Sequence, residues 1–308
     1  MKPVEDAFAS ETFRRVILPG IVLAAGVHPL VSTLAPTINS LYGVGASVSL
    51  IAEVIFFGLI ASSATQWIYY VYEGFRLQSL TTLARDANER RVRQLDELMN
   101  RPQPAGGFSS SQQESRSTAY EALQDFPIRK RGNGTEEHFA ERPTRLGNII
   151  AAYELYPETR YGVDGVFYWF HLLNFASDTS RKEFADQCAF AESLVLTSFS
   201  GALVAVLHAL VLIGFGIGVW CPRLVFLDLR SGPRTSLSLM AFGIAVWAVF
   251  YAMALPAYRD AGKLFRSIVD IAMPPFFEWL QKVNAPANGT TIQNAKKIRD
   301  YLLNLSGG

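Results

Sequence analysis

Four long apolar runs constrain the fold of this chain more than any other feature. A helix of about 20 residues crosses a hydrocarbon core of about 30 Å, and runs of at least that length lie at about residues 16–36, 46–75, 193–220 and 235–257. The net charge is only +1, yet the 28 basic and 27 acidic residues crowd the segments between these runs. The sequence therefore predicts an all-α membrane protein with two transmembrane helical hairpins, four transmembrane helices in all.

Two segments outside the runs are long enough to fold in water. Residues 76–191 are predicted to form an α-helical cytosolic domain, with a flexible linker at about residues 101–117 because that stretch is rich in Pro, Gly, Ser and Gln. Residues 259–308 are predicted to form C-terminal helices, with a break at Pro274-Pro275.

The charged stretch after the second run has the pattern of an amphipathic helix. Apolar residues recur there at a spacing of three or four, among them Ala84, Leu95 and Leu98. Two interpretations are open: a short coiled neck between subunits, or a helix packed on its own domain.

The distribution of basic residues predicts the topology. The loop at residues 37–45 has no Lys or Arg, whereas basic residues occur at residues 1–15 and directly after the second run. The longest apolar stretch within residues 76–191 is too short to span a bilayer as a helix. We therefore expect both termini and the domain between the hairpins to be cytoplasmic.

Between the hairpins, the segment from Thr144 to Phe175 carries the densest pattern outside the apolar runs. Thr144 can cap a helix that stops at Pro157, and Asp164 can cap the next one. The second helix begins with the aromatic run FYWF at residues 167–170, which we expect to pack on the membrane face or on a partner subunit.

The motif TRLGN at residues 144–148, followed by Glu154, Tyr156-Pro157, Tyr161-Gly162 and Asp164, resembles a pattern of largely uncharacterised bacterial four-helix integral membrane proteins. The resemblance covers about the middle tenth of the chain, together with its layout of hairpin, cytosolic domain and hairpin. It implies a protein of the bacterial cytoplasmic (inner) membrane and carries no established activity.

Four charged residues in this segment are candidates for a cytosolic ligand site or a subunit contact: Arg145, Glu154, Arg160 and Asp164. Charges that bracket two short helices can bind an anion or lock a turn. The alternative is that they are structural ion pairs and helix caps, which is the commoner role of such residues.

Three ionisable residues fall inside the apolar runs: His28, Glu53 and His208. In an antiparallel hairpin, His28 and Glu53 lie at similar depth, roughly 12 Å from the outer end, so they can face each other. Together with His208 they are candidates for a proton or ion pathway. The alternative is a hydrogen bond that ties the first hairpin together.

The third run carries a stripe of small residues at a spacing of four, which lets another helix approach closely inside lipid. The stripe consists of Ser193, Thr197, Gly201, Ala205 and Ala209, and Gly214 and Gly218 add a further pair.

Catalytic sequence motifs are not found. The chain has no P-loop, dinucleotide fingerprint, nucleophile elbow or zinc-ligand spacing, so we expect no enzyme activity, no cofactor and no metal site. The partners expected are the lipid bilayer, further copies of the chain and a cytosolic protein, and no nucleic acid. The leading hypothesis is an oligomeric pore, channel or ion pathway gated by the cytosolic domain, including a membrane effector. The rival is a non-conducting membrane anchor or receptor whose cytosolic domain binds a protein or a ligand.

Overall fold

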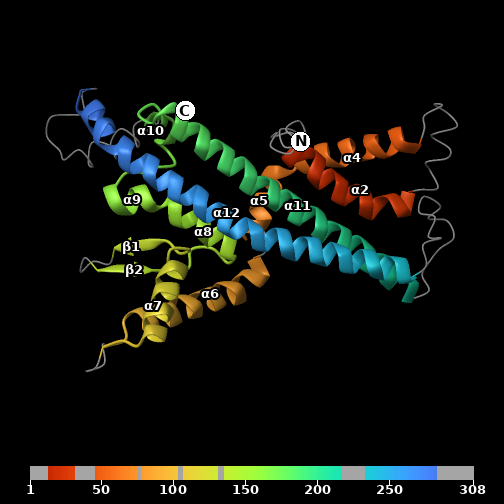
Figure 1. The fold of residues 1–308 in the computed structure, drawn as a ribbon, viewed down its shortest axis with the longest axis horizontal. Helices are drawn as coiled ribbons and strands as arrows, with labels where there is room; N and C mark the ends of the chain where they lie inside the picture. The colour runs from red at the N-terminus through yellow and green to blue at the C-terminus, as the bar shows by residue number, and fades with distance from the viewer. Residues whose placement is uncertain are drawn as a thin grey trace. The chain divides into compact units, whose positions relative to one another are not determined.

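The residues that the computed structural model describes are mostly helical (83%), and the chain divides into two compact units (Figure 1). The first unit comprises Met1–Tyr69 and Cys188–Ala257, and the second comprises Tyr70–Gln187 and Tyr258–Gly308. The structure describes residues 13–31, 46–74, 78–102, 107–130, 135–216 and 233–282.

In the first unit, a short π-helix η1 (Phe13–Ile17) leads into α2 (Leu18–Val31), and α4 (Ala46–Ser63) follows. Helix α5 (Thr65–Glu73) begins in this unit and ends in the second. Two long helices, α11 (Asp178–Gly216) and α12 (Pro233–Lys282), each contribute to both units.

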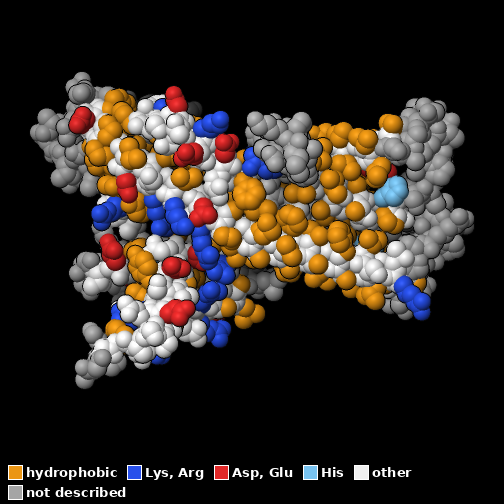
Figure 2. Space-filling model, viewed as in Figure 1, with side chains coloured by type: hydrophobic (Ala, Val, Ile, Leu, Met, Phe, Trp, Pro, Cys, Tyr) orange, Lys and Arg blue, Asp and Glu red, His pale blue; other side chains and the backbone are white. Residues whose placement is uncertain are grey.

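Helices α11 and α12 are each long and apolar enough to cross a membrane. The segments Leu50–Ser63 and Thr65–Glu73 meet at a bend of 58° and make a third candidate if they count as one span. The predicted first span at residues 16–36 is described only as far as residue 31. Hydrophobic side chains cover much of the visible face over α2, α4, α11 and α12, as expected of a surface in contact with lipid (Figure 2). Exposed examples are Ile51, Phe56, Leu59, Leu210 and Val249.

Helices α2 and α4 approach each other through two glycines. A Cβ atom on Gly20 would lie 2.0 Å from the carbonyl oxygen of Val54, and one on Gly58 would lie 2.0 Å from that of Val16. Neither distance can hold a methyl group, so the backbones touch at these two points. Close approach of this kind is the main packing device available to helices in lipid.

Helices α11 and α12 also meet through small residues, on the predicted stripe. A Cβ on Gly201 would lie 2.8 Å from the carbonyl oxygen of Gly243, and one on Gly243 would lie 2.7 Å from the amide nitrogen of Ala205. Ser193 and Thr197 of the stripe are buried, and Ala209 and Gly214 are half-buried. Gly218 lies outside the described residues.

The second unit contains α6 (Gln78–Met99), α7 (Ser110–Leu123), α8 (Arg145–Glu154), α9 (Tyr156–Tyr161) and α10 (Trp169–Leu173). It also contains an antiparallel strand pair, β1 (Ile128–Lys130) and β2 (Glu136–His138), in which Arg129 lies opposite Glu137. The strands were not predicted, because three-residue strands carry too short a pattern to detect; Asn133-Gly134 between them is a dipeptide typical of turns. The turn itself lies outside the described residues.

Helix α7 begins inside the stretch that was predicted to be a linker. Ser109 accepts a hydrogen bond from the backbone of Gln112, whose side chain bonds back to Ser109, so a capping box starts the helix at Ser110. The polar composition of this stretch therefore reflects an exposed helix rather than a flexible chain over residues 110–117.

Helix α6 packs on its own unit. Val92 is buried against Leu123, Phe126 and Ala140, and Leu95 also packs against this cluster. These contacts favour the second of the two interpretations of α6, a helix packed on its own domain.

The predicted helix break at Pro274-Pro275 is not present, because α12 continues through both prolines to Lys282. Proline in a helix interior costs about 3 kcal/mol or more. The surrounding residues Met273, Phe276 and Leu280 are fully buried in the main core of the unit, and their burial offsets that cost.

Residues 167–169 of the aromatic run pack on the core of the second unit itself, a set of contacts that the prediction did not include. The rings of Tyr168 and Phe276 lie 5.2 Å apart, and Trp169 stacks on Phe265 at 4.7 Å. Phe170 alone is largely exposed, at 79%. The prediction missed the apolar face of α12 that supplies these partners.

Candidate functional site

The TRLGN motif joins three backbone segments of the second unit. The Thr144 hydroxyl caps α8 by accepting from the amide of Gly147 at 3.0 Å, and it donates to the carbonyl oxygen of Tyr72. Asn148 is fully buried and bonds the backbone of Arg142 in both directions, at 2.9 and 2.7 Å. A Cβ on Gly147 would lie 2.8 Å from the carbonyl oxygen of Glu73. The motif thus fixes the start of α8 to the end of α5.

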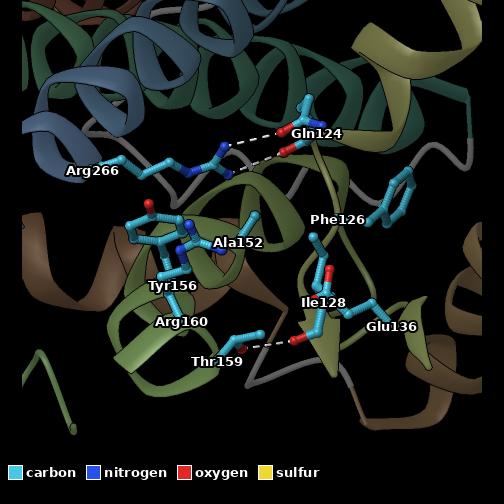
Figure 3. Close-up of a pocket in the computed structure, with 9 residues that line it drawn as sticks. All are labelled: Gln124, Phe126, Ile128, Glu136, Ala152, Tyr156, Thr159, Arg160 and Arg266. Carbon is cyan, nitrogen blue, oxygen red and sulfur yellow. Dashed lines mark hydrogen bonds between the residues drawn. The ribbon is translucent and has the colours of Figure 1, made fainter. Parts of the chain in front are cut away.

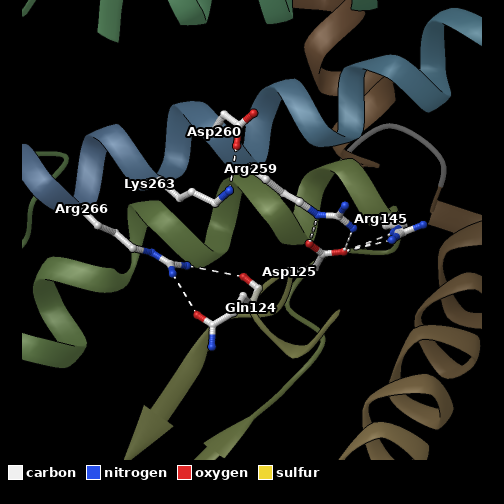
Figure 4. A network of polar contacts seen from close by, with 7 residues as sticks. All are labelled: Gln124, Asp125, Arg145, Arg259, Asp260, Lys263 and Arg266. Carbon is white, nitrogen blue, oxygen red and sulfur yellow. Dashed lines mark hydrogen bonds and ion pairs between the residues drawn. The ribbon is translucent and has the colours of Figure 1, made fainter. Parts of the chain in front are cut away.

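A buried carboxylate, Asp125, holds two arginines that are distant in sequence (Figure 4). Arg259 of α12 donates to both of its oxygens, at 2.5 and 2.6 Å, in the bidentate geometry that makes arginine pairs strong. Arg145 of α8 donates to Oδ2 from Nε and Nη2, at 3.3 and 3.2 Å. Asp125 therefore ties α8 to α12 just after α7 ends.

Arg91 of α6 belongs to the same charged region. Burial lowers the pKa of Arg91, and the like charges of Arg145 and Arg259 lower it further, while Asp125 acts in the opposite direction.

A cavity of about 250 Å³ lies beside this network, between α8, α9, β1 and α12 (Figure 3). Its apolar wall is formed by Phe126, Ile128 and Ala152. Its polar wall is formed by Gln124, Glu136, Tyr156, Thr159, Arg160 and Arg266. Two guanidinium groups from different elements, α9 and α12, thus line one small space.

Arg266 is half-buried and its hydrogen-bond partners are neutral. It donates to the side-chain oxygen of Gln124 at 3.1 Å and to the Gln124 carbonyl at 3.5 Å, and its guanidinium lies 5.5 Å from the ring centre of Tyr156. Its Nε is buried without a hydrogen-bond partner among the described residues. Asp270, an acid that acts on the pKa of Arg266, accepts hydrogen bonds from Tyr156 and Tyr161 at 2.7 and 2.8 Å.

These contacts keep both tyrosines protonated. Burial raises the pKa of Tyr156, and the hydrogen bond to the Asp270 carboxylate raises it further. The same two causes, in the same order, raise the pKa of Tyr161. The two hydroxyls therefore act as hydrogen-bond donors that anchor α9 to α12.

The four charged candidates of the central segment do not form one cluster. Arg145 binds Asp125, Arg160 lines the cavity of Figure 3, and Glu154 and Asp164 line a separate cavity of about 240 Å³. Asp164 accepts from the amide of Phe167 at 3.0 Å, which is the predicted capping role. Burial raises the pKa of Glu154, and Arg142 opposes this rise.

The three candidates in the apolar runs also separate. His28 Nδ1 lies 3.0 Å from Glu53 Oε2, so these two residues of α2 and α4 do face each other. His208 is fully buried, and its Nε2 lies 2.9 Å from the carbonyl oxygen of Gly26. Gly26 and His28 are two residues apart, about 200° around the helix. His208 therefore packs on the side of α2 away from the His28–Glu53 pair.

Sequence reasoning missed Gln124 and Asp125, which carry no local signal. Arg259 and Arg266 were not singled out either. Their helical spacing with Lys263, which puts all three on related faces of α12, was the available signal. Within the part of the chain that the structure describes, no group of three or more His, Cys, Asp or Glu side chains is placed to hold a metal ion.

No protein-family model, curated protein or solved structure matches this chain. Inferences about function therefore depend on the geometry of the chain itself.

Proposed function

We propose that the protein spans the bacterial cytoplasmic membrane four times, as two helical hairpins. In this proposal α2 and α4 belong to the first hairpin and the apolar parts of α11 and α12 form the second. The exposed apolar side chains of the first unit and its glycine-mediated helix contacts support this topology. The second unit, with both termini, then lies in the cytoplasm.

The topology can be tested with a native cysteine. Cys221 falls in the loop between the third and fourth apolar runs, which the proposal places outside. In a Cys188→Ser background, a membrane-impermeant maleimide should label Cys221 in intact spheroplasts. Labelling that requires lysis of the membrane would contradict the proposed orientation.

We further propose that the protein is a membrane-anchored receptor whose cytoplasmic unit binds a small organic anion in the cavity lined by Arg160 and Arg266. The single observation that carries this proposal is Arg266, a half-buried cation on the cavity wall with neutral hydrogen-bond partners and one unused buried donor. The acid that acts on Arg266, Asp270, is hydrogen-bonded to two tyrosines, and a bound anion would give the Arg266 guanidinium a direct charged partner.

The residues that line the cavity indicate the charge, the polarity and the size of its ligand. Arg160 adds a second guanidinium, and planar guanidinium groups bind carboxylates and phosphates well. Phe126, Ile128 and Ala152 offer an apolar surface to the rest of the ligand. A volume of about 250 Å³ limits the ligand to a small molecule.

Thermal unfolding of the full chain in detergent tests this proposal, with millimolar phosphate, citrate and benzoate as separate probes. A ligand at 100 times its dissociation constant stabilises by about 2.7 kcal/mol, which raises the melting temperature measurably. At least one probe should stabilise the wild type and Arg90→Gln, a control that removes an exposed charge elsewhere in the unit. Arg160→Gln should abolish the effect. Equal stabilisation of Arg160→Gln, or none in the wild type, would refute the cavity as a binding site.

An oligomeric ion pathway is the second candidate, and the His28–Glu53 pair supports it. The two side chains are 42% and 19% exposed, so the pair reaches the surface of the first unit, where a second copy of the chain can cover it. Ionisable groups in apolar helices usually have a functional or pairing partner.

Ion flux in liposomes and the mass of the detergent-solubilised protein test this second candidate together. A pathway through the pair predicts an oligomer, with flux that Glu53→Gln reduces. A monomer without flux would mean that the His28–Glu53 pair only links α2 to α4 and has no role in ion transport.

A further inference from the structure

The cavity of Figure 3 is lined by charges of both signs, which come from different elements of the second unit. Arg160 of α9 and Arg266 of α12 supply two guanidinium groups, and Glu136 of β2 supplies a carboxylate. Figure 3 shows Glu136 on the side of the cavity away from both arginines. A ligand with an anionic group alone would therefore have a repulsive neighbour in Glu136.

The Glu136 carboxylate is not used by the fold. Glu136 is exposed, and no hydrogen bond or ion pair joins its side chain to a described residue. Arg129 of the neighbouring strand pairs with Glu137 instead, at 3.5 Å. Arg160 is likewise exposed and forms no ion pair with a described acid. Both charges are therefore available to a ligand that enters the cavity.

A hydrogen bond fixes the two sides of the cavity to each other. The Thr159 hydroxyl donates to the carbonyl oxygen of Ile128 at 2.8 Å, which holds α9 on β1 (Figure 3). Arg160 follows Thr159 directly, and β1 pairs with β2, which carries Glu136. The guanidinium side and the carboxylate side are thus set at a defined spacing. Preorganised groups of this kind bind with a lower entropic cost.

The apolar wall and the volume suit a ligand that carries both charges on a short carbon chain. Phe126 and Ile128 line the same space as the charged groups. The cavity measures about 250 Å³, whereas a dry protein cavity of about 150 Å³ already holds benzene. A skeleton of about six carbon atoms therefore fits, with room for two charged groups.

From this arrangement we infer that the small organic anion of the proposed function is an amino acid. Its carboxylate binds Arg160 and Arg266, its ammonium group binds Glu136, and its carbon chain lies on Phe126 and Ile128. The inference rests on the proposed function, because it requires the cavity to bind a carboxylate, and it adds a second charge of opposite sign to the ligand.

Isothermal titration calorimetry of the full chain in detergent tests this inference with two matched pairs of probes. Leucine is compared with isocaproate, and ε-aminocaproate is compared with caproate, so that only the amino group differs within a pair. The two charges are adjacent in leucine and far apart in ε-aminocaproate, and the pairs thus cover both spacings. In at least one pair, the wild type should bind the amino acid about fivefold more tightly than the carboxylate, the upper range for an ion pair that water can reach.

Substitutions at two exposed glutamates make the test specific. Glu136→Gln should abolish the preference for the amino acid, while the plain carboxylate should bind as well as before or better because a repulsive charge is gone. Glu136→Asp keeps the charge and should retain part of the preference. Glu114→Gln removes an exposed glutamate of α7 outside the cavity lining and should behave as the wild type. Both positions are exposed, so all three variants should keep the thermal stability of the wild type.

A substitution on the other strand gives a change in the opposite direction. Lys130 lies opposite Glu136 in the register of the strand pair. Lys130→Gln removes a cation that competes for the Glu136 carboxylate, so the preference for the amino acid should stay or grow. A loss of the preference in this variant would contradict the assignment of the ammonium group to Glu136.

Three further outcomes would overturn the inference: no binding of either amino acid, equal or tighter binding of the plain carboxylate in both pairs, or an unchanged preference in Glu136→Gln. If an anion then still stabilises the wild type but not Arg160→Gln, only the amino acid is rejected and the anion cavity stands. If no anion stabilises the wild type, the proposed function fails as well.

Discussion

In the first unit, helix backbones touch at several glycines, whereas in the second unit the helices meet mainly through large rings and charged groups. Gly20, Gly58 and Gly201 bring backbones into direct contact in the first unit. In the second unit, Phe276 is buried among aromatic rings, and Asp125 is buried between two arginines.

This difference is what the proposed topology predicts, with the first unit in lipid and the second unit in water. Lipid offers apolar side chains no gain on leaving it, so close backbone contact and van der Waals packing have to hold the helices together. In water, burial of aromatic surface stabilises the fold, and charges at the periphery remain solvated. The long helices α11 and α12 each carry both kinds of surface along one continuous element.

The largest loss of stability is predicted for the ion pairs of Asp125 with Arg145 and Arg259 in the second unit. Asp125→Ala removes the carboxylate that Arg145 and Arg259 share, and breaking a buried ion pair costs 3–5 kcal/mol. The two arginine side chains are 32% and 34% exposed, so water can solvate them partly, and we expect a loss of about 3 kcal/mol. Hydrogen exchange followed by mass spectrometry should show faster exchange in α8 and in the second-unit part of α12.

Asp86→Ala is the matched control, because Asp86 is an exposed acid on α6. It should leave the exchange of both helices unchanged. Unaltered exchange in Asp125→Ala would mean that the aromatic core alone holds these helices. The ion pairs of Asp125 would then not contribute to the stability of the second unit.

The second prediction concerns the first unit. Gly58→Ala adds a methyl group 2.0 Å from the carbonyl oxygen of Val16, so α2 and α4 have to move apart. Overpacking of this kind costs 1–3 kcal/mol, and we expect about 2 kcal/mol. Titration with sodium dodecyl sulfate, followed by circular dichroism, measures the change in the unfolding midpoint.

Ala25→Leu is the counterpart, because Ala25 is exposed on α2. A much larger side chain at this position should be tolerated if the surface faces lipid. A lower midpoint for Ala25→Leu than for Gly58→Ala would show that steric contact between the backbones is not what limits the first unit.

The elements that could be predicted from the sequence are those whose pattern is local. The apolar runs, the Thr144 cap and the Asp164 cap each depend on a few neighbouring residues. The contact of His28 with Glu53 was predictable too, because antiparallel packing of the two apolar runs brings these positions opposite each other. A single stripe at a spacing of four likewise located Gly201 at a helix contact.

The remaining features depend on contacts between distant segments. Asp125 joins α8 to α12 across 20 and 134 residues of sequence, and no local pattern marks it. The uninterrupted course of α12 through Pro274-Pro275 depends on burial against α10 and the preceding loop, which overrides local propensity. The anion cavity was only partly anticipated, because Arg160 was a candidate and Arg266 was not.

The third prediction is a pH dependence with a defined sign. Burial raises the pKa of Glu154, so the folded state binds a proton more tightly than the unfolded state. This residue therefore destabilises the fold as the pH rises above the ordinary glutamate pKa of about 4.3, and the penalty is complete once the pH exceeds its folded pKa.

Glu154→Gln should remove that penalty. The variant should be more stable than the wild type at pH 7, and the difference should vanish at pH 4. Thermal unfolding at a series of pH values measures it. A variant that is less stable than the wild type at pH 7 would indicate that the interaction of Glu154 with Arg142 outweighs the cost of burial.

The smallest change in stability is expected for the ion pair of Lys263 with Asp260, which lies on α12 about one turn from Arg259. Lys263 donates to Asp260 at 2.8 Å, a shorter contact than either bond of Arg145 to Asp125. The Lys263 and Asp260 side chains are 75% and 58% exposed, however, and exposed ion pairs contribute about 0–1 kcal/mol. We expect Lys263→Ala to change the unfolding free energy by less than about 0.5 kcal/mol, because alanine also favours the helix. The same exchange experiment as for Asp125→Ala decides the point. A loss in Lys263→Ala as large as in Asp125→Ala would mean that distance, rather than burial, sets the strength of ion pairs along this helix.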